Sequence, residues 1–425
     1  MENFSWLVGD KLIRMVVNLG VSVLVARYLG PEQLGYWNYL LSFTLFFTVF
    51  SNLGLESIVP RELVKHPDSV EKILSTVFRL KFLGGLLGFV LSIVVFVWYK
   101  GSGVEILLPL SLIASLMIFQ SLEVFDYFFK AKLEAKYTIY ARNISFAILT
   151  LFKLGLVYFD APLIYFFPIN GLEILIGGLM VYIYFKRKGG AFSLSAWDSV
   201  TARALLRDSL PMAISGLLVL IYMRIDQVMV TDMVGERANG IYSTGVRLIE
   251  VLYFIPIALG ESFFPGLVYA REQSKGRYEK NLLSFYGIMT YVGIFFTIAV
   301  TLVAIPLMDF LFGEEYLGSG HVLLVYGLTL YSTFVGIAVS KFLMAENFLK
   351  IILYRSIFGV LINVGLNLVL IPKYGYMGAA YASLISYYLV AFSLILFKDS
   401  RPQLALLLRA WNPRIIIAKI KEKLD

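Results

Sequence analysis

Long apolar runs alternate with short polar segments along the whole chain. Each run is long enough to cross the roughly 30 Å apolar core of a bilayer. Apolar residues are continuous within a run instead of alternating at period two, which predicts helices rather than the strands of a barrel. Six spans are predicted before a polar segment at 186–209: Leu7–Leu29, Gly35–Val59, Leu74–Trp98, Glu105–Phe129, Tyr137–Phe159 and Pro162–Phe185. Six more follow it: Leu210–Met233, Gly240–Val268, Leu282–Ile305, His321–Ala345, Leu349–Ile371 and Tyr376–Phe397.

Composition supports the same fold class. Hydrophobic residues make up 59% of the 425 residues and charged residues only 16%. A soluble domain of this length could not bury so many apolar residues in one core. We therefore predict an all-α integral membrane protein with twelve transmembrane helices.

Lys and Arg are distributed unevenly between alternate loops. Three cations are assigned to the outer loops, Lys100, Arg237 and Lys373, whereas the inner loops and the tail carry many more. By the positive-inside rule both termini are cytoplasmic. The predicted location is the cell (plasma) membrane, crossed many times.

The net charge of +8 lies along one membrane face. This differs from the folded basic patch of a nucleic-acid-binding protein, so membrane lipids are the expected partners and nucleic acid is not. The segment 401–425 mixes Leu, Ile and Trp with bases and predicts a basic amphipathic helix at the cytoplasmic interface.

Metal and thiol chemistry is not expected. The chain has no Cys and two His, His66 and His321, which the predicted topology puts on opposite membrane faces. No cofactor is predicted, and coupling to H⁺ or Na⁺ is left open.

The two halves of the sequence repeat one another. At an offset of 205 positions Gly30 matches Gly235 and Gly35 matches Gly240, and the segment ESIVP at 56–60 matches ESFFP at 261–265. A slightly longer offset places Arg142 on Arg355. An even number of spans in each half makes the repeats parallel. The prediction is an N-terminal six-helix lobe (1–185), a cytoplasmic inter-lobe loop (186–209), a C-terminal six-helix lobe (210–400) and the tail (401–425), with a central cavity between the lobes.

Ionisable residues inside the spans are costly and usually face the bundle interior or water. Lys11 and Arg14 share one face of the first span. Counting inward from the outer ends of the seventh and eighth spans places Arg224 level with Glu250 and Asp226 level with Arg247, so two crossed ion pairs are geometrically feasible. Lys153 and Glu173 form a further candidate pair. The candidate substrate-binding residues are Lys11, Arg14, Lys153, Glu173, Arg224, Asp226, Arg247 and Glu250.

Structural roles compete with binding at these positions. The second-lobe charges could only neutralise one another, and Lys11 and Arg14 could snorkel to the interface. For Glu56 and Glu261 we expect a cap or turn role. For the remaining cations of the spans we expect contacts with lipid headgroups: Arg79, Lys81, Arg142, Lys341 and Arg355.

Cations in a helical cavity suit an anionic cargo. Guanidinium groups match the oxygens of phosphate or diphosphate, and the attraction strengthens away from bulk water. Tyr and Asn side chains near the spans could stack on or hydrogen-bond to sugars.

Several segments resemble a known family. ARYLGPEQLGY at 26–36, NLGLE at 52–56, RID at 224–226, GIYS at 240–243, RLIE at 247–250 and IPKYGYMGAA at 371–380 resemble the polysaccharide-biosynthesis flippases of the multidrug/oligosaccharidyl-lipid/polysaccharide (MOP) exporter superfamily. The likeness covers essentially the whole chain. It implies a MATE-like fold and a flippase that moves polyprenyl-diphosphate-linked oligosaccharides to the outer leaflet by alternating access, with glycan-assembly proteins as candidate partners.

Comparison with the related lipid II flippases shows differences. They carry arginines in the first, second and eighth spans and two additional helices. Arg14 and Arg247 match the first and eighth in kind, but the second span has no central cation and no thirteenth span is predicted. These departures argue against lipid II as the substrate.

Two other functions compete with the flippase prediction. A cation-coupled multidrug exporter of the same superfamily would be expected to have a cavity dominated by carboxylates. A membrane-embedded polysaccharide polymerase or glycosyltransferase would usually carry catalytic groups on large surface loops, whereas the outer loops of this chain are short and no nucleotide-binding or nucleophile motif occurs. We therefore expect a transporter and not an enzyme.

Overall fold

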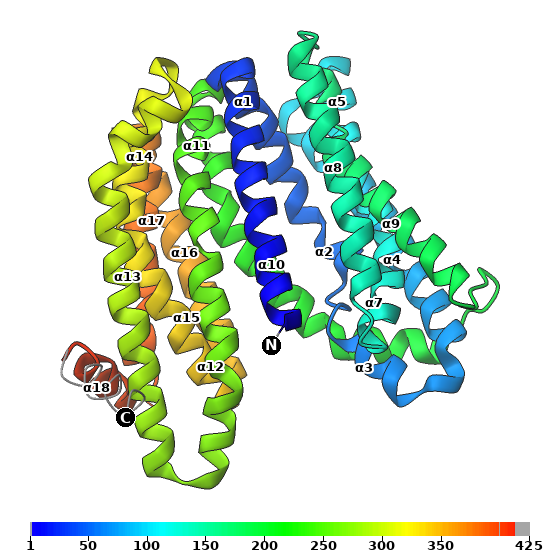
Figure 1. Ribbon diagram of the computed structural model, residues 1–425. Coiled ribbons are helices and arrows are strands. Elements are labelled where there is room, and N and C mark those ends of the chain that lie inside the picture. The colour runs from blue at the N-terminus through cyan, green and yellow to red at the C-terminus, as the bar shows by residue number, and fades with distance from the viewer. Residues whose placement is uncertain (1, 399, 413–425) are drawn as a thin grey trace. The chain divides into compact units, whose positions relative to one another are not determined.

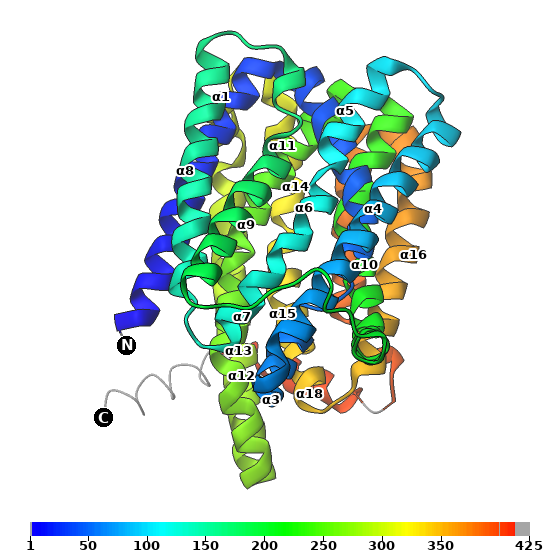
Figure 2. The same cartoon turned by 90° about the vertical axis from the view of Figure 1, so that its right-hand side faces the viewer.

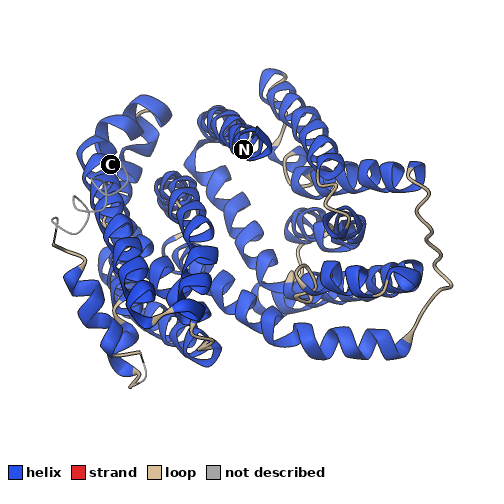
Figure 3. Cartoon of the chain, turned by 60° about the horizontal axis from the view of Figure 1, so that its bottom comes forward, coloured by secondary structure: helices blue, strands red, loops and turns tan. Residues whose placement is uncertain are grey.

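The computed structural model describes residues 2–398 and 400–412, with side chains described from Arg14 onward. Throughout that part of the chain the regular structure is helical, with no strand (Figure 3). The predicted all-α fold is therefore confirmed.

The helices of the first half follow the predicted spans. They are α1 (Glu2–Phe47), α2 (Val49–Asn52), α3 (Ile58–Lys65), η1 (Pro67–Ser69), α4 (Val70–Lys100), α5 (Val104–Ala114), α6 (Leu116–Phe119), η2 (Gln120–Glu123), α7 (Val124–Ala131), α8 (Lys136–Tyr158), η3 (Leu163–Tyr165) and α9 (Ile169–Arg187) (Figure 1). Helices α8 and α9 pack side by side (Figure 2).

The second half has the same organisation. Its helices are α10 (Ser199–Val234), α11 (Glu236–Leu252), α12 (Phe254–Gln273), α13 (Lys275–Phe312), η4 (Glu314–Tyr316), α14 (Leu317–Gly327), α15 (Thr329–Ala345), α16 (Leu349–Tyr374), α17 (Tyr376–Ala391), η5 (Ser393–Leu396) and α18 (Pro402–Arg409). In this half α13 packs against α14 and α15, and α16 packs against α17.

Nine of the predicted spans lie on helices, or on one bent helix pair at 314–345, that are long and apolar enough to cross a membrane. The other three lie on the first arm of α1, on its second arm continued by α2 and the start of α3, and on α17 with η5. The two arms of α1 meet at Gly30, whose φ of 68° interrupts the helix, and Pro31 opens the second arm. A multi-pass membrane protein of roughly twelve spans agrees with the sequence prediction.

Several spans are broken at equivalent places in the two halves. The second span breaks at Thr48 and the eighth at Tyr253, 205 positions later. The fourth breaks at Ser115 and the tenth at Leu328. Side-chain hydroxyls contribute to these breaks, since Thr48 Oγ1 donates to the Leu45 carbonyl at 2.6 Å and Ser115 Oγ to the Leu112 carbonyl at 2.7 Å. The repeat found in the sequence therefore extends to the positions of the bends.

The chain divides into two compact units. The first unit contains residues 1–29 and 36–224, and the second contains 30–35 and 225–425. The segment 186–209 belongs to the first unit, and the division falls inside α10. Asp198 caps the start of α10: Thr201 donates to its carboxylate through the backbone N–H at 3.2 Å and also through the hydroxyl, and Lys72 Nζ lies 3.2 Å away.

Each unit has its own apolar core. In the first unit Leu74, Phe125, Phe129 and Phe185 are buried together with residues of α3, α8 and α10. In the second unit α12, α13, α15 and the end of α17 enclose the larger aromatic residues Phe285, Tyr286, Phe334 and Phe342.

The described part of the tail contains one short helix, α18. Leu407 and Ala410 are buried in the core of the second unit, whereas Leu408 is 59% and Trp411 50% exposed. Tyr291 donates its hydroxyl to the Trp411 carbonyl at 2.7 Å. The helix is thus anchored on one side and presents apolar side chains on the other, while residues 413–425 lie outside the described part.

Candidate functional site

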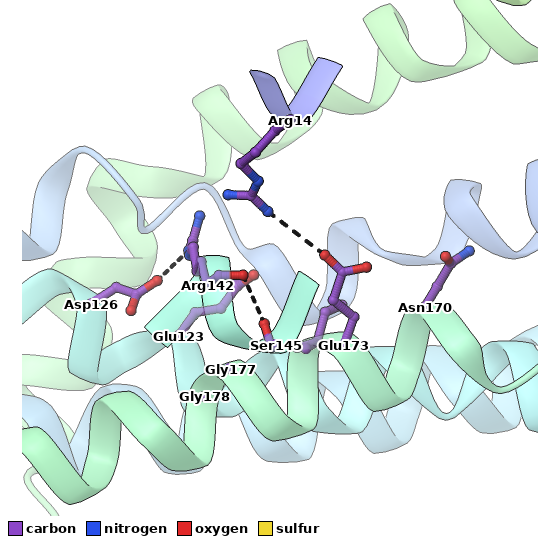
Figure 4. A pocket seen from close by; sticks show the side chains of 10 residues that line it. Arg14, Glu123, Asp126, Arg142, Ser145, Asn170, Glu173, Gly177 and Gly178 are labelled. Carbon is purple, nitrogen blue, oxygen red and sulfur yellow. Dashed lines mark hydrogen bonds and ion pairs between the residues drawn. The ribbon is translucent and has the colours of Figure 1, made fainter. Parts of the chain in front are cut away.

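A polar cavity lies within the first unit, among α1, η2, α7, α8 and α9 (Figure 4). Its volume is about 360 Å³, which is in the range of small-ligand sites. The lining residues are Arg14, Glu123, Asp126, Arg142, Ser145, Asn170, Glu173, Ile174, Gly177 and Gly178. Its wall therefore carries two guanidinium groups and three carboxylates.

Two glycines allow α9 to approach its neighbours closely at this cavity. A Cβ atom on Gly178 would lie 2.5 Å from Leu122 Cβ, and one on Gly177 would lie 3.1 Å from Ser145 Oγ. Larger residues would separate the helices that hold the charged groups. Glycine at these two positions therefore lets α9 pack closely, so that the charged groups on the neighbouring helices lie near one another.

Arg14 and Glu173 are two predicted site residues that the structure brings together. The guanidinium and carboxylate lie 3.8 Å apart, and the two side chains are 31% and 29% exposed. Figure 4 shows the Arg14 side chain extending from α1 toward Glu173 on α9. The guanidinium also lies over the Phe146 ring, 4.8 Å from its centroid. Glu173, which the sequence prediction pairs with Lys153, is thus a neighbour of Arg14.

Two more ion pairs border the cavity, and the burial of one cation, Lys81, corrects the prediction that it contacts headgroups. Arg142 pairs with Asp126, whose side chain is only 5% exposed, but Arg142 itself is 48% exposed, so its headgroup contact stays a prediction. Lys81 is fully buried, with its ammonium 3.1 Å from Glu123 and 3.3 Å from the Tyr127 hydroxyl. A cation that carries its own counter-ion can stay inside the bundle instead of reaching for lipid phosphate.

Glu56 and Glu261, for which we expect a cap or turn role, both form ion pairs; Glu56 does lie in a turn, just before α3, whereas Glu261 lies inside α12. Glu56 lies 2.7 Å from Lys130, and Glu261 lies 2.7 Å from Lys341. The glutamates are 205 positions apart and the lysines 211, so one pair repeats in the two units. This repetition corrects the headgroup assignment of Lys341 as well.

The second unit holds a buried polar cluster around Asp226. Its carboxylate accepts hydrogen bonds from Tyr242 Oη at 2.8 Å, from Asn367 Nδ2 at 2.6 Å and from the Ser383 hydroxyl. Asn363 Nδ2 donates in turn to the Ser383 hydroxyl at 3.4 Å, and Asp226 itself is 2% exposed. Tyr242, Asn367 and Ser383 are neutral donors, so this carboxylate sits in a different setting from the three in the first unit.

Arg355 is held inside the second unit. It is 4% exposed and donates to the Ser393 hydroxyl at 3.0 Å and the Val390 carbonyl at 2.9 Å. The headgroup contact expected for this residue is therefore wrong, because α16 turns it toward the end of α17.

The remaining candidate site residues stay predictions. Lys153, Arg224, Arg247 and Glu250 all interact with neighbours, and the crossed pairs of the seventh and eighth spans stay a prediction as well. The side chain of Lys11 lies outside the described part. Sequence reasoning did not include Glu123, Asp126 and Arg142 in the site, although an ionisable residue within an apolar run was the signal that could have found them.

The fold and the buried polar site define a polytopic helical membrane protein. A solved MATE-family multidrug resistance transporter of the MOP superfamily, in an inward-facing conformation, aligns with a TM-score of 0.74 at 15% identity, covering 94% of this chain and 96% of that one. A solved lipid II flippase, MurJ, in an inward closed conformation aligns with a TM-score of 0.73 at 16% identity, covering 97% and 92%. The chain shares its fold with these two proteins.

The sequence identifies the family itself. The chain belongs to the polysaccharide biosynthesis protein family, whose model matches residues 1–268. The capsular polysaccharide biosynthesis protein CapF of Staphylococcus aureus is similar to it, with 20% identity over 411 residues that cover 91% of this chain and 98% of that protein.

Proposed function

We propose that this protein is a flippase that carries polyprenyl-diphosphate-linked oligosaccharides from the cytoplasmic to the outer leaflet for cell-surface polysaccharide assembly. The observation that carries the proposal is the partly exposed Arg14 guanidinium at a polar cavity of a polysaccharide biosynthesis family protein. A guanidinium inside a helical bundle suits a diphosphate, which accepts two parallel hydrogen bonds from it. The resemblance in fold to a lipid II flippase agrees with this class of cargo.

Transport proceeds by alternating access in this proposal. Lys11, Arg14 and Arg247 attract the diphosphate, and Arg224, Asp226 and Glu250 shape the site or couple it to an ion. The polyprenyl tail stays in the bilayer while the polar head crosses, and both termini face the cytoplasm of a plasma-membrane protein. Residues of this chain bind and release the cargo, and no covalent bond is made or broken.

Reconstituted vesicles test the assignment. A lipid-linked oligosaccharide carrying a fluorophore on its sugar is placed in both leaflets, and its exposure to an external quencher is followed over time. Arg14→Ala and Arg247→Ala should each slow translocation at least about ten-fold, because each removes charge-assisted hydrogen bonds to the diphosphate. Unchanged translocation in both variants contradicts the assignment.

Ion coupling is proposed for the Asp226 cluster. A carboxylate surrounded by neutral donors and acceptors inside a unit can take up a proton or a small cation in exchange for part of its hydrogen bonding. Translocation in the same vesicles is measured under an imposed pH or Na⁺ gradient. Asp226→Asn should abolish the response to whichever gradient accelerates the wild type, and a retained response rules out Asp226 as the coupling group.

A cation-coupled multidrug exporter is the second candidate, favoured by the fold match to the MATE-family transporter. The three carboxylates of the first-unit cavity are compatible with a cationic drug. Efflux of a cationic dye from cells that express the protein separates the two candidates. Dye efflux without oligosaccharide translocation would favour the exporter.

A further inference from the structure

The ion pairs of the first-unit cavity differ in how firmly they are held. Two pairs each have one buried member: Asp126 is 5% exposed although Arg142 is 48% exposed, and Lys81 is fully buried although Glu123 is 29% exposed. The Arg14–Glu173 pair has a separation of 3.8 Å, which is too long for a hydrogen bond, and about 30% of each side chain is exposed. The same cavity is therefore bordered by two fixed pairs and one loose pair.

We propose that Glu173 is an internal counter-ion for Arg14 that the diphosphate of the substrate displaces. This inference rests on the proposed function, because it assigns the cargo's anionic group to Arg14. Before the cargo binds, Glu173 balances the guanidinium at little structural cost. When the diphosphate arrives, Arg14 turns its donors from one distant carboxylate oxygen to two phosphate oxygens.

The geometry of the Arg14–Glu173 pair lets the diphosphate replace Glu173 at a low cost in free energy. A partly exposed ion pair without a hydrogen bond contributes little to stability, so its loss is easily compensated. Phe146 supports the Arg14 guanidinium from one face, which leaves its edge donors available to a ligand. The released Glu173 carboxylate stays accessible to water, and Asn170 lines the cavity one helical turn before it on α9.

The other two cations at this cavity, Arg142 and Lys81, cannot act in the same way. Removing Arg142 from Asp126 would leave a nearly buried carboxylate without its counter-ion, which is strongly unfavourable. Lys81 is fully buried and is not among the residues that line the cavity. These pairs set the shape of the wall. Arg14 is thus the cation of this wall that a ligand can recruit.

Glu173 also makes the site discriminate between anions of different charge. Two cationic and three anionic side chains line the cavity, and the buried Lys81 pairs with one of the carboxylates, Glu123, so the three pairs leave no excess positive charge at the wall. A small monovalent anion therefore meets a guanidinium that already has a counter-ion. A diphosphate offers enough charge and enough acceptor oxygens to replace Glu173.

Binding of a short isoprenyl diphosphate to the purified protein in lipid nanodiscs, measured by calorimetry, tests the inference. Glu173→Gln keeps the side-chain size and removes the competing charge, so binding should tighten by about two- to five-fold. Arg14→Ala should weaken binding by about ten-fold or more, and Glu173→Gln should give no gain in the Arg14→Ala background. Glu105→Gln, an exposed acidic residue at the start of α5 outside the cavity lining, is the charge-matched control and should leave binding unchanged.

The outcomes separate this inference from the proposed function. If Arg14→Ala weakens binding but Glu173→Gln leaves it unchanged or weakens it, Glu173 is no displaceable counter-ion, and the diphosphate assignment stands. If the isoprenyl diphosphate does not bind, or Arg14→Ala has no effect on it, the proposed cargo fails. Binding of inorganic pyrophosphate is measured in the same way. If Glu173→Gln binds pyrophosphate more tightly than the wild type does but shows no such gain for the isoprenyl diphosphate, Glu173 is a counter-ion that a free anion displaces. Thermal unfolding of each variant, together with Glu173→Ala as a second substitution, shows that the changes in affinity come from folded protein.

Discussion

Gly35 and Gly240 occupy equivalent positions in the two halves of the sequence, and each lies against the helix start that contains the other. A Cβ atom on Gly35 would fall 1.8 Å from the Glu236 carbonyl oxygen, and one on Gly240 would fall 1.7 Å from the Pro31 carbonyl oxygen. Asn239 donates to the Gly35 carbonyl at 2.9 Å. The backbones meet directly because neither residue has a side chain.

Alanine at either glycine should therefore destabilise the protein. Gly35→Ala and Gly240→Ala each force the backbones apart, at a cost of about 1–3 kcal/mol. Thermal unfolding in detergent measures the effect. Gly336→Ala is the matched control, because a Cβ there meets nothing within 4 Å and alanine favours a helix interior. Equal melting temperatures for all three variants would contradict the close packing.

The Lys81–Glu123 pair predicts unequal effects of removing its two members. Glu123→Gln leaves the fully buried Lys81 ammonium without its counter-ion and should cost about 3–5 kcal/mol. Lys81→Met leaves Glu123, which is 29% exposed and can reach water, so its cost should be smaller. Unfolding of the two variants under one set of conditions gives the comparison. A larger loss for Lys81→Met would show that Lys81 is not held as described.

The repeated pairs Glu56–Lys130 and Glu261–Lys341 should contribute little to stability. Their glutamates are 77% and 67% exposed, so water screens the attraction. Glu56→Gln and Glu261→Gln should each change the free energy of unfolding by less than about 1 kcal/mol. Raising the salt concentration should reduce the difference from wild type further. A loss as large as that of Glu123→Gln would place these pairs in a buried setting.

Asp198 should stabilise the start of α10 over the whole physiological pH range. The Thr201 hydroxyl, then its backbone N–H and the Lys72 ammonium, lower the pKa of Asp198 to about 2. A carboxyl whose folded-state pKa is depressed stabilises the fold above its ordinary value of 3.8, and this contribution is lost as pH falls toward 2. Asp198→Ala should lower the melting temperature equally from pH 8 to pH 5, with the difference shrinking below pH 4. Asp208→Ala, an exposed acidic residue on the same helix, is the control.

The spans could be predicted from the sequence because bilayer thickness fixes the length of an apolar run. The breaks inside the spans could not. Whether Ser115 bonds back to the Leu112 carbonyl and bends the fourth span depends on the packing around it. Internal repetition was visible because Gly35 and Gly240 are constrained by backbone contact in both halves.

The candidate site was predictable only in part. A charge in an apolar run signals a buried polar group, and Arg14 and Glu173 were found in this way. The ion-pair partner of each charge was harder to predict, because it depends on how helices from distant parts of the chain pack. Glu173 faces Arg14, which lies 159 positions earlier in the sequence. The sequence prediction assigns Lys81 to lipid because it judges depth from one span alone, whereas Glu123 on the following span pairs with Lys81 inside the bundle.

The three ion pairs of the first-unit cavity also imply an order of assembly. Lys81 and Glu123 lie on consecutive spans, as do Asp126 and Arg142, so both pairs can form while the chain is still being inserted. Each pairing lowers the cost of leaving a newly delivered charge in the bilayer. Arg14 and Glu173 belong to the first and sixth spans, so their pair must wait until every helix between them is in place. The loosest pair is therefore the last to form, and its formation marks the completion of the N-terminal half of the protein.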